Sequence, residues 1–153
     1  MTFKPLTKED LPFYIEVHNH PSTLKYLGDD KFITLKEAEK WFSGYKNMWY
    51  VISKDEKVGI FKTLQPFDIM DGLCLKRWVE IGCDIHPDYR RRGYAREAYK
   101  IVLDKLDDIG AKSFLRCFFD NPALSLYKEL GFEVNEKETK IIYNRKYIKM
   151  TRI

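Results

Sequence analysis

The stretch from Ile85 to Ala95, which reads IHPDYRRRGYA, constrains this chain more than any other part of its sequence. The mostly apolar run Arg77–Ile85 comes directly before it and predicts a strand. The run Gly93–Ile109 follows it with the spacing of apolar residues that an amphipathic helix requires. The sequence therefore predicts a strand, a short basic turn and the beginning of a helix.

This predicted helix start is suited to hold a phosphate group. The first amides of a helix have no partner within the helix, and the helix dipole adds positive potential there. Gly93 lets the backbone approach a ligand closely because it has no Cβ. The clustered basic residues indicate a local anion site, with a solvated arginine-rich helix start as the alternative: Arg90, Arg91, Arg92, Arg96 and Lys100.

Length and composition indicate one folded domain. The chain has 153 residues, of which 44% are hydrophobic, so we expect residues 1–153 to form a single domain with a sizeable core. No apolar run approaches the length of a membrane span, and Met1–Lys4 does not begin a signal peptide. Three scattered cysteines indicate a reducing compartment, and the histidines complete no metal-ligand set. We therefore expect a cytoplasmic protein with no membrane partner and no metal.

Hydrophobic periodicity and turn residues predict the order of the remaining elements. Hairpins come first and a β–α–β–α unit follows, which favours a mixed α/β sheet with helices on both faces. The predicted elements are a strand at Thr2–Leu6, helices at Thr7–His18, Ser22–Leu27 and Thr34–Gly44, strands at Trp49–Ser53 and Lys57–Leu64, a loop at Gln65–Leu75, a strand at Ser113–Phe119, a helix from Asp120–Pro122 to Gly131, and strands at Glu138–Tyr143 and Lys146–Ile153.

Two motifs in this order resemble the GNAT superfamily of N-acetyltransferases. The first is Arg-x-x-Gly-x-Ala at residues 90–95, preceded by Ile-x-Pro at residues 85–87, and it is similar to the family's acyl-CoA pyrophosphate loop. The second is DNPALSLYKELGF at residues 120–132, which is similar to a family helix that begins at Asn or Asp and carries an exposed Tyr before Leu-Gly-Phe. The chain lacks the Gly-Lys-Ser/Thr of a Walker loop and the glycines of a dinucleotide-binding fingerprint.

The resemblance extends over almost the whole chain. The N-terminal half is similar to the branch that includes ribosomal-protein N-terminal acetyltransferases and spermidine acetyltransferases, through Leu6-Thr7-x-x-Asp10-Leu11, Thr34-x-x-Glu37-Ala38-x-x-Trp41-Phe42, Val58-Gly59 and Glu80-Ile81-Gly82. It implies the GNAT fold of the α/β (α+β) class, with a mixed, mostly antiparallel sheet of about seven strands and about four helices on both faces. The sheet would splay at its centre, between the strand ending at Ile85 and the strand starting at Ser113, and acetyl-CoA would lie in the splay.

The resemblance also implies an acetyl-CoA-dependent enzyme that transfers an acetyl group directly to a primary amine. Backbone amides of the basic turn would hold the pyrophosphate, and the end of the preceding strand would pair with the pantetheine arm. Asp120 has the family's spacing before the tyrosine and Asn121 lies one residue nearer, so either could contact CoA. The implied cofactor-binding set is Cys83, Ile85, Arg90, Arg91, Arg92, Gly93, Tyr94, Ala95, Arg96, Asp120 and Asn121.

Three residues are candidates for proton transfer. Tyr127 matches the family's general acid for the CoA thiolate, and a phenol keeps its proton at neutral pH because its ordinary pKa is about 10. Glu80 would take the proton from the amine through water, and Asp84, which lies on the same face of the strand, could do the same. The structural alternatives are a packing role for Tyr127 and ordinary ion pairs for the two carboxylates.

The expected partner is a small-molecule or peptide amine: a protein N-terminus, a polyamine, an amino acid or an amino sugar. Its binding site would be formed by Asn19–Phe32, the Gln65–Arg77 loop with Asp68 and Asp71, and the last hairpin. Nucleic acid is not expected, because acidic residues interrupt the basic patch. The chain would be a monomer or a homodimer. A catalytically weak, CoA-binding regulatory module is the alternative function.

Overall fold

The computed structural model describes residues 1–28, 31–43, 49–64, 67–68, 73–74 and 78–153. The predicted helix end near Gly44 and the loop residue Asp71 lie outside these ranges. Within them, no helix is both long and apolar enough to cross a membrane.

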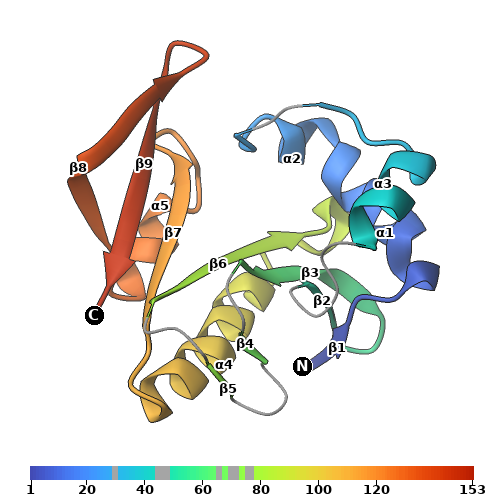
Figure 1. Ribbon diagram of the computed structural model, residues 1–153, viewed down its shortest axis with the longest axis horizontal. Coiled ribbons are helices and arrows are strands. Elements are labelled where there is room, and N and C mark those ends of the chain that lie inside the picture. The colour runs from blue at the N-terminus through green and yellow to red at the C-terminus, as the bar shows by residue number, and fades with distance from the viewer. Residues whose placement is uncertain (29–30, 44–48, 65–66, 69–72, 75–77) are drawn as a thin grey trace.

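A seven-stranded sheet forms the centre of the protein, with the order β1-β2-β3-β6-β7-β9-β8 (Figure 1). All neighbouring strands are antiparallel except β6 and β7, which are parallel. The predicted mixed, mostly antiparallel sheet is therefore confirmed. Its strands are β1 (Thr2–Pro5), β2 (Trp49–Ser53), β3 (Lys57–Thr63), β6 (Trp78–Ile85), β7 (Lys112–Phe118), β8 (Glu133–Ile142) and β9 (Arg145–Arg152), and a separate pair consists of β4 (Phe67–Asp68) and β5 (Leu73–Cys74).

Helices cover both faces of the sheet. On β2, Tyr50 and Ile52 pack in one hydrophobic core with α4, whereas Val51 packs in a second core with α1 and α3. This alternation is what a strand between two helical layers requires, because successive side chains point to opposite faces. The helices are α1 (Leu11–Asn19), α2 (Pro21–Leu24), α3 (Leu35–Phe42), α4 (Tyr94–Asp108) and α5 (Leu124–Glu129), with short 3-10 turns at Lys8–Asp10 and Pro87–Tyr89.

The strands β6 and β7 separate soon after they begin. Their pairing joins residues 78–80 of β6 to residues 112–114 of β7. Beyond that point β6 is paired with β3 alone, along residues 81–85. The two parts of the sheet therefore open as a V, which Figure 1 shows between β6 and β7. The splay expected at this place is confirmed.

Several boundaries differ from the prediction, each for a local reason. β8 begins at Glu133 rather than Glu138, because its first residues pair with the end of β9. α5 begins at Leu124 because the side chain of Asn121 accepts a hydrogen bond from the amide of Ala123 at 2.8 Å, which forms a turn before the helix. The predicted loop at residues 65–75 contains the β4–β5 pair.

Candidate active site

A cavity of about 800 Å³ lies in the splay and brings the two sequence motifs together. One wall comes from β6, the turn after it and the first turn of α4, and the opposite wall comes from β7 and the α5 region. Arg92 and Asp120 are not part of its lining. The predicted site residues that do line it are Glu80, Cys83, Ile85, Arg90, Arg91, Gly93, Tyr94, Ala95, Arg96, Asn121 and Tyr127.

The first turn of α4 opens onto this cavity without a capping side chain. Gly93 occupies the N-cap position with a φ of 80°, in the left-handed region that favours glycine. A Cβ built at Gly93 would meet no protein atom within 4 Å, so the space beside it is free of protein. Arg91 also has a left-handed φ of 60°. The arrangement leaves amides of the helix start available to an anion.

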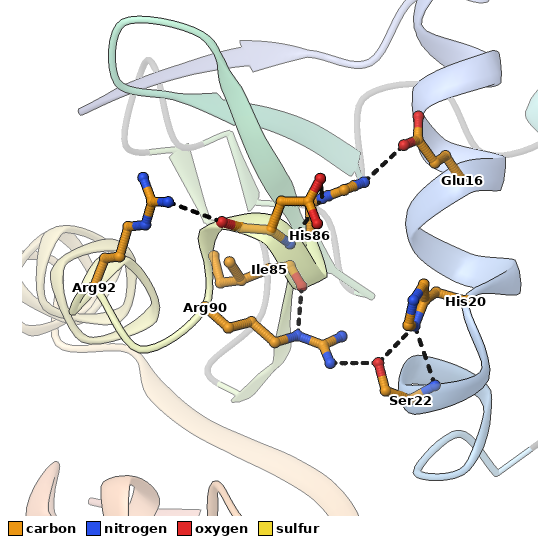
Figure 2. Close-up of polar contacts among 8 residues, drawn as sticks. Glu16, His20, Ser22, Ile85, His86, Arg90 and Arg92 are labelled. Carbon is orange, nitrogen blue, oxygen red and sulfur yellow. Dashed lines mark hydrogen bonds and ion pairs between the residues drawn. The ribbon is translucent and has the colours of Figure 1, made fainter.

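Arg90 directs its side chain away from the helix start and toward α2 (Figure 2). Its Nε donates to the carbonyl oxygen of Ile85 at 2.9 Å. Its two Nη atoms donate to the hydroxyls of Ser22 at 2.6 Å and Thr23 at 2.8 Å. These three hydrogen bonds engage the guanidinium group that was expected to contact the cofactor, and the sequence did not indicate them.

Two further arginines of the motif, Arg92 and Arg96, also have protein partners. Arg92 donates to the carbonyl oxygen of Asp88 at 3.0 Å, a contact that Figure 2 shows, and its guanidinium lies 5.4 Å from the ring centre of Tyr89. Arg96 pairs with Glu129 at 2.8 Å. The guanidinium groups of Arg90, Arg92 and Arg96 are therefore engaged by protein groups, which leaves the backbone amides and Arg91 as the donors available to a phosphate.

Tyr127 is a buried residue of α5 that lines the cavity. Its ring packs edge to face against that of Tyr99 on α4, and the two ring centres are 5.7 Å apart. Burial raises the pKa of Tyr127 above its ordinary value of 10.0. The phenol therefore stays protonated at neutral pH and can donate its proton.

Both candidate carboxylates of β6 have cationic neighbours. A Glu80 oxygen lies 2.8 Å from Nη1 of Arg116 on β7, so this ion pair joins the two walls near the base of the splay. An Asp84 oxygen lies 4.0 Å from Nζ of Lys62 on β3, a looser pair. The ordinary ion pairs considered for these residues are present, and they leave a catalytic role open to either carboxylate.

A second cavity, of about 310 Å³, lies beside the first. The two share Leu27, Lys62, Asp84 and Tyr147 in their linings. The second cavity is also lined by Tyr14, Val17, His18, Gly28, Trp49 and Ile60. Sequence reasoning missed it because these residues come from four distant segments, with no spacing that could have connected them.

The structure separates the roles of Asp120 and Asn121. Asp120 accepts hydrogen bonds from Nε and Nη2 of Arg145 at 3.2 Å and 2.7 Å, and this contact lowers the pKa of its carboxyl group. Asn121 lines the main cavity, although its side-chain oxygen is engaged by the amide of Ala123. Of the two alternatives, Asn121 is therefore the residue nearer to the cleft.

Cys83 lines the cavity as a small, unreactive side chain. Burial raises the pKa of its thiol well above the ordinary value of 9.0, and the neighbouring Asp84 adds to the effect. The thiolate, which is the nucleophilic form, is therefore scarce at neutral pH. Cys83 thus suits a binding role through its backbone better than covalent chemistry.

Comparison with known proteins agrees with this arrangement. A model of the acetyltransferase (GNAT) domain matches residues 1–133. The chain is similar to the structure of spermidine N-acetyltransferase from Vibrio cholerae in complex with CoA and spermine, with a TM-score of 0.81 and 19% identity over 98% of this chain and 93% of that one. The comparison with curated proteins gave no match.

Two further solved structures show the same likeness. A putative acetyltransferase from Salmonella typhimurium, solved with its cofactor acetyl-CoA, has a TM-score of 0.72 and 19% identity over 99% of this chain and 92% of that one. Ribosomal-protein-alanine N-acetyltransferase from Brucella melitensis has a TM-score of 0.71 and 17% identity over 100% and 99% of the two chains. At these identities the likeness establishes the fold alone.

Proposed function

The chain belongs to the GNAT acetyltransferase family, and from that premise we propose how its site carries out acetyl-CoA-dependent N-acetyl transfer. The observation that carries the proposal is the separation of β6 from β7, which opens a cavity with the uncapped start of α4 and Tyr127 both in its lining. We also propose that residues 1–153 form a single domain.

The groups that would hold acetyl-CoA are backbone groups on one wall of the cavity. Amides of residues 91–96 suit the pyrophosphate, because they lie at the positive end of α4 beside the open space at Gly93. Residues 83–85 of β6 have no strand partner on the side of β7, so the pantetheine arm can pair with them as an added strand. The arrangement fits an acyl-CoA in both its charge and its shape.

Direct transfer requires a neutral amine and a proton for the departing thiolate. The amine nitrogen attacks the thioester carbonyl carbon, the carbon–sulfur bond breaks, and the sulfur takes the proton of Tyr127. Glu80 or Asp84, acting through water, accepts the proton that the amine loses. Glu80 faces the inner part of the cavity near β7, whereas Asp84 stands where the two cavities meet. We retain Glu80 as the first candidate and Asp84 as its alternative.

We further propose that the acceptor amine enters through the second cavity. Its aromatic side chains offer apolar walls, and Asp84 marks its junction with the main cavity. In the described part of the lining, Asp84 is the one carboxylate, and it already faces Lys62. A compact amine, such as an amino acid, an amino sugar or a peptide N-terminus, suits this lining better than a polyamine with several ammonium groups.

The direct test is the release of CoA thiol by the purified chain with acetyl-CoA and a panel of amines. Peptides, amino acids, amino sugars and polyamines form the panel, and mass spectrometry identifies the acetylated product. We expect turnover with at least one compact amine and weaker turnover with spermidine. Tight acetyl-CoA binding without turnover of any amine would instead support the CoA-binding regulatory module. Light scattering would distinguish a monomer from a homodimer.

A further inference from the structure

We infer that Arg90 is a positioning residue for the acceptor site, which holds α2 against the end of β6 and does not serve primarily as a phosphate ligand. The inference rests on the proposed function, because it assigns the acceptor to the cavities beside α2. It separates two parts of the cofactor motif: the backbone of the turn suits the pyrophosphate, whereas the side chain of Arg90 holds α2.

The guanidinium of Arg90 is committed to a fork of three hydrogen bonds (Figure 2). The bond from Nε to the carbonyl oxygen of Ile85 anchors the side chain to its own strand. The bonds from Nη1 and Nη2 reach Ser22 and Thr23, neighbouring residues of α2 that are far away in the sequence. Thr23 is buried, so its hydroxyl needs this partner. A planar fork of this kind is specific to arginine.

The same network extends to the beginning of α2. Arginine only donates, so the Ser22 oxygen accepts from Arg90 and can direct its own proton to Nδ1 of His20, 2.7 Å away. The Nδ1 atom also accepts from the Ser22 amide at 3.2 Å, which caps the helix. Figure 2 shows the continuous path from Ile85 through Arg90 and Ser22 to His20.

A second arginine holds the other end of this segment. Nη1 of Arg145 on β9 donates to the carbonyl oxygen of Lys25 at 2.6 Å, and its guanidinium lies 3.9 Å from the ring centre of Phe118. The segment 21–28 is thus attached to both sides of the splay, and Figure 1 shows α2 facing the open side of the V.

The attached segment forms walls of both cavities. Ser22, Thr23 and Tyr26 line the main cavity, Gly28 lines the second, and Leu27 lines both. A displacement of α2 would therefore change the place where the acceptor meets the thioester. We expect the start of α4, which suits the pyrophosphate, to remain in place, because the hydrogen bond from the Glu97 amide to the Gly93 carbonyl oxygen lies at the start of the helix itself.

The test separates the charge of Arg90 from its fork. Arg90→Lys keeps the charge and loses the paired donors, so we expect the acceptor KM to rise about tenfold, corresponding to about 1.4 kcal/mol. The Kd of acetyl-CoA, measured by calorimetry, should change less than about twofold on that same scale. Thr23→Val removes one acceptor of the fork and should raise the acceptor KM as well. The double variant should raise the acceptor KM by less than the product of the two single increases, because both substitutions break the same hydrogen-bond network.

Arg152→Lys is the matched control. Arg152 also makes a three-bond fork, to the carbonyl oxygen of Leu130 and to both oxygens of Asp107, but it does not line either cavity. Its substitution should leave the acceptor KM unchanged. Both variants need a check of melting temperature, so that a general loss of stability is not mistaken for a loss of positioning.

A second measurement does not depend on turnover. Amide hydrogen exchange in residues 20–27 should become faster in Arg90→Lys and stay unchanged in Arg152→Lys, even if every tested amine fails as an acceptor. Failure of the proposed function is thereby distinguished from failure of this inference. An Arg90→Lys variant with normal exchange and normal acceptor KM, together with an Arg90→Ala variant that binds acetyl-CoA weakly, would make Arg90 a phosphate ligand and overturn the inference.

Discussion

Tyr99 of α4 and Tyr127 of α5 pack edge to face, with their ring centres 5.7 Å apart and their ring planes at 78° to each other. Both residues line the main cavity, and burial raises the pKa of each. The ring contact gives Tyr127 a fixed position and its burial keeps it protonated, which are the two properties that a general acid needs.

Tyr127→Phe should therefore lower kcat by about 10²- to 10⁴-fold, the usual contribution of a general acid. The Kd of acetyl-CoA should stay nearly unchanged, because the contact is needed in the transition state. Since the pKa of Tyr127 is raised, the wild-type rate should show no alkaline fall due to this group below about pH 10. Steady-state kinetics with calorimetry would check this, and a folded Tyr127→Phe variant with full kcat would leave Tyr127 as a packing residue.

The Glu80→Gln variant should have a lower transfer rate than wild type at neutral pH, and part of the lost rate should return at high pH. The substitution keeps the shape and removes the base, and at high pH more of the acceptor amine is already neutral. Arg116→Gln is the control, because it breaks the Glu80–Arg116 pair without removing the carboxylate. Equal pH–rate profiles for Glu80→Gln and wild type would exclude this role, and a loss confined to Asp84→Asn would assign it to Asp84.

Gly93→Ala should raise the Kd of acetyl-CoA at least about tenfold, or about 1.4 kcal/mol. The new Cβ would occupy the open space where the pyrophosphate approaches the start of α4. Gly110→Ala is the matched control, because Gly110 follows the other end of α4, has a φ of 67°, and also has no protein atom within 4 Å of a built Cβ. Both variants carry the same backbone strain. An equal Kd in the two variants would contradict a close cofactor approach at Gly93.

Asp107→Asn should lower the free energy of unfolding at neutral pH by about 0.2–1 kcal/mol, the range for a largely exposed ion pair. Hydrogen bonds from Arg152 lower the pKa of Asp107 below its ordinary value of 3.8. A lowered pKa stabilises the folded state above the unfolded pKa, and this contribution is lost as the pH falls through the folded pKa. Urea denaturation should therefore show a difference in the free energy of unfolding between wild type and Asp107→Asn at neutral pH, and this difference should disappear in strong acid. Asp108→Asn, at a position with no ion pair among the described residues, should show no such difference.

Most elements of the fold could be predicted because their signals are local. The apolar spacing of α4, the polar cap of α3 at Thr34 and the position of Gly93 at the start of α4 each depend on residues within a few positions of one another. The two motifs also predicted the cavity, since they flank strands that meet at the splay. The extension of β8 to Glu133 was missed because it depends on pairing with the distant end of β9.

The amino-acid sequence by itself determined the strand–turn–helix unit, the family and the uncapped helix start at Gly93, because the periodicity along α4 and the glycine at its start are properties of short segments. Only the tertiary structure decided where the side chains of that unit point. Arg90 reaches α2, Glu80 meets Arg116, and Asp84 stands between two cavities. Each of these contacts joins elements separated by long stretches of chain, and the packing of the sheet and helices selects the partner.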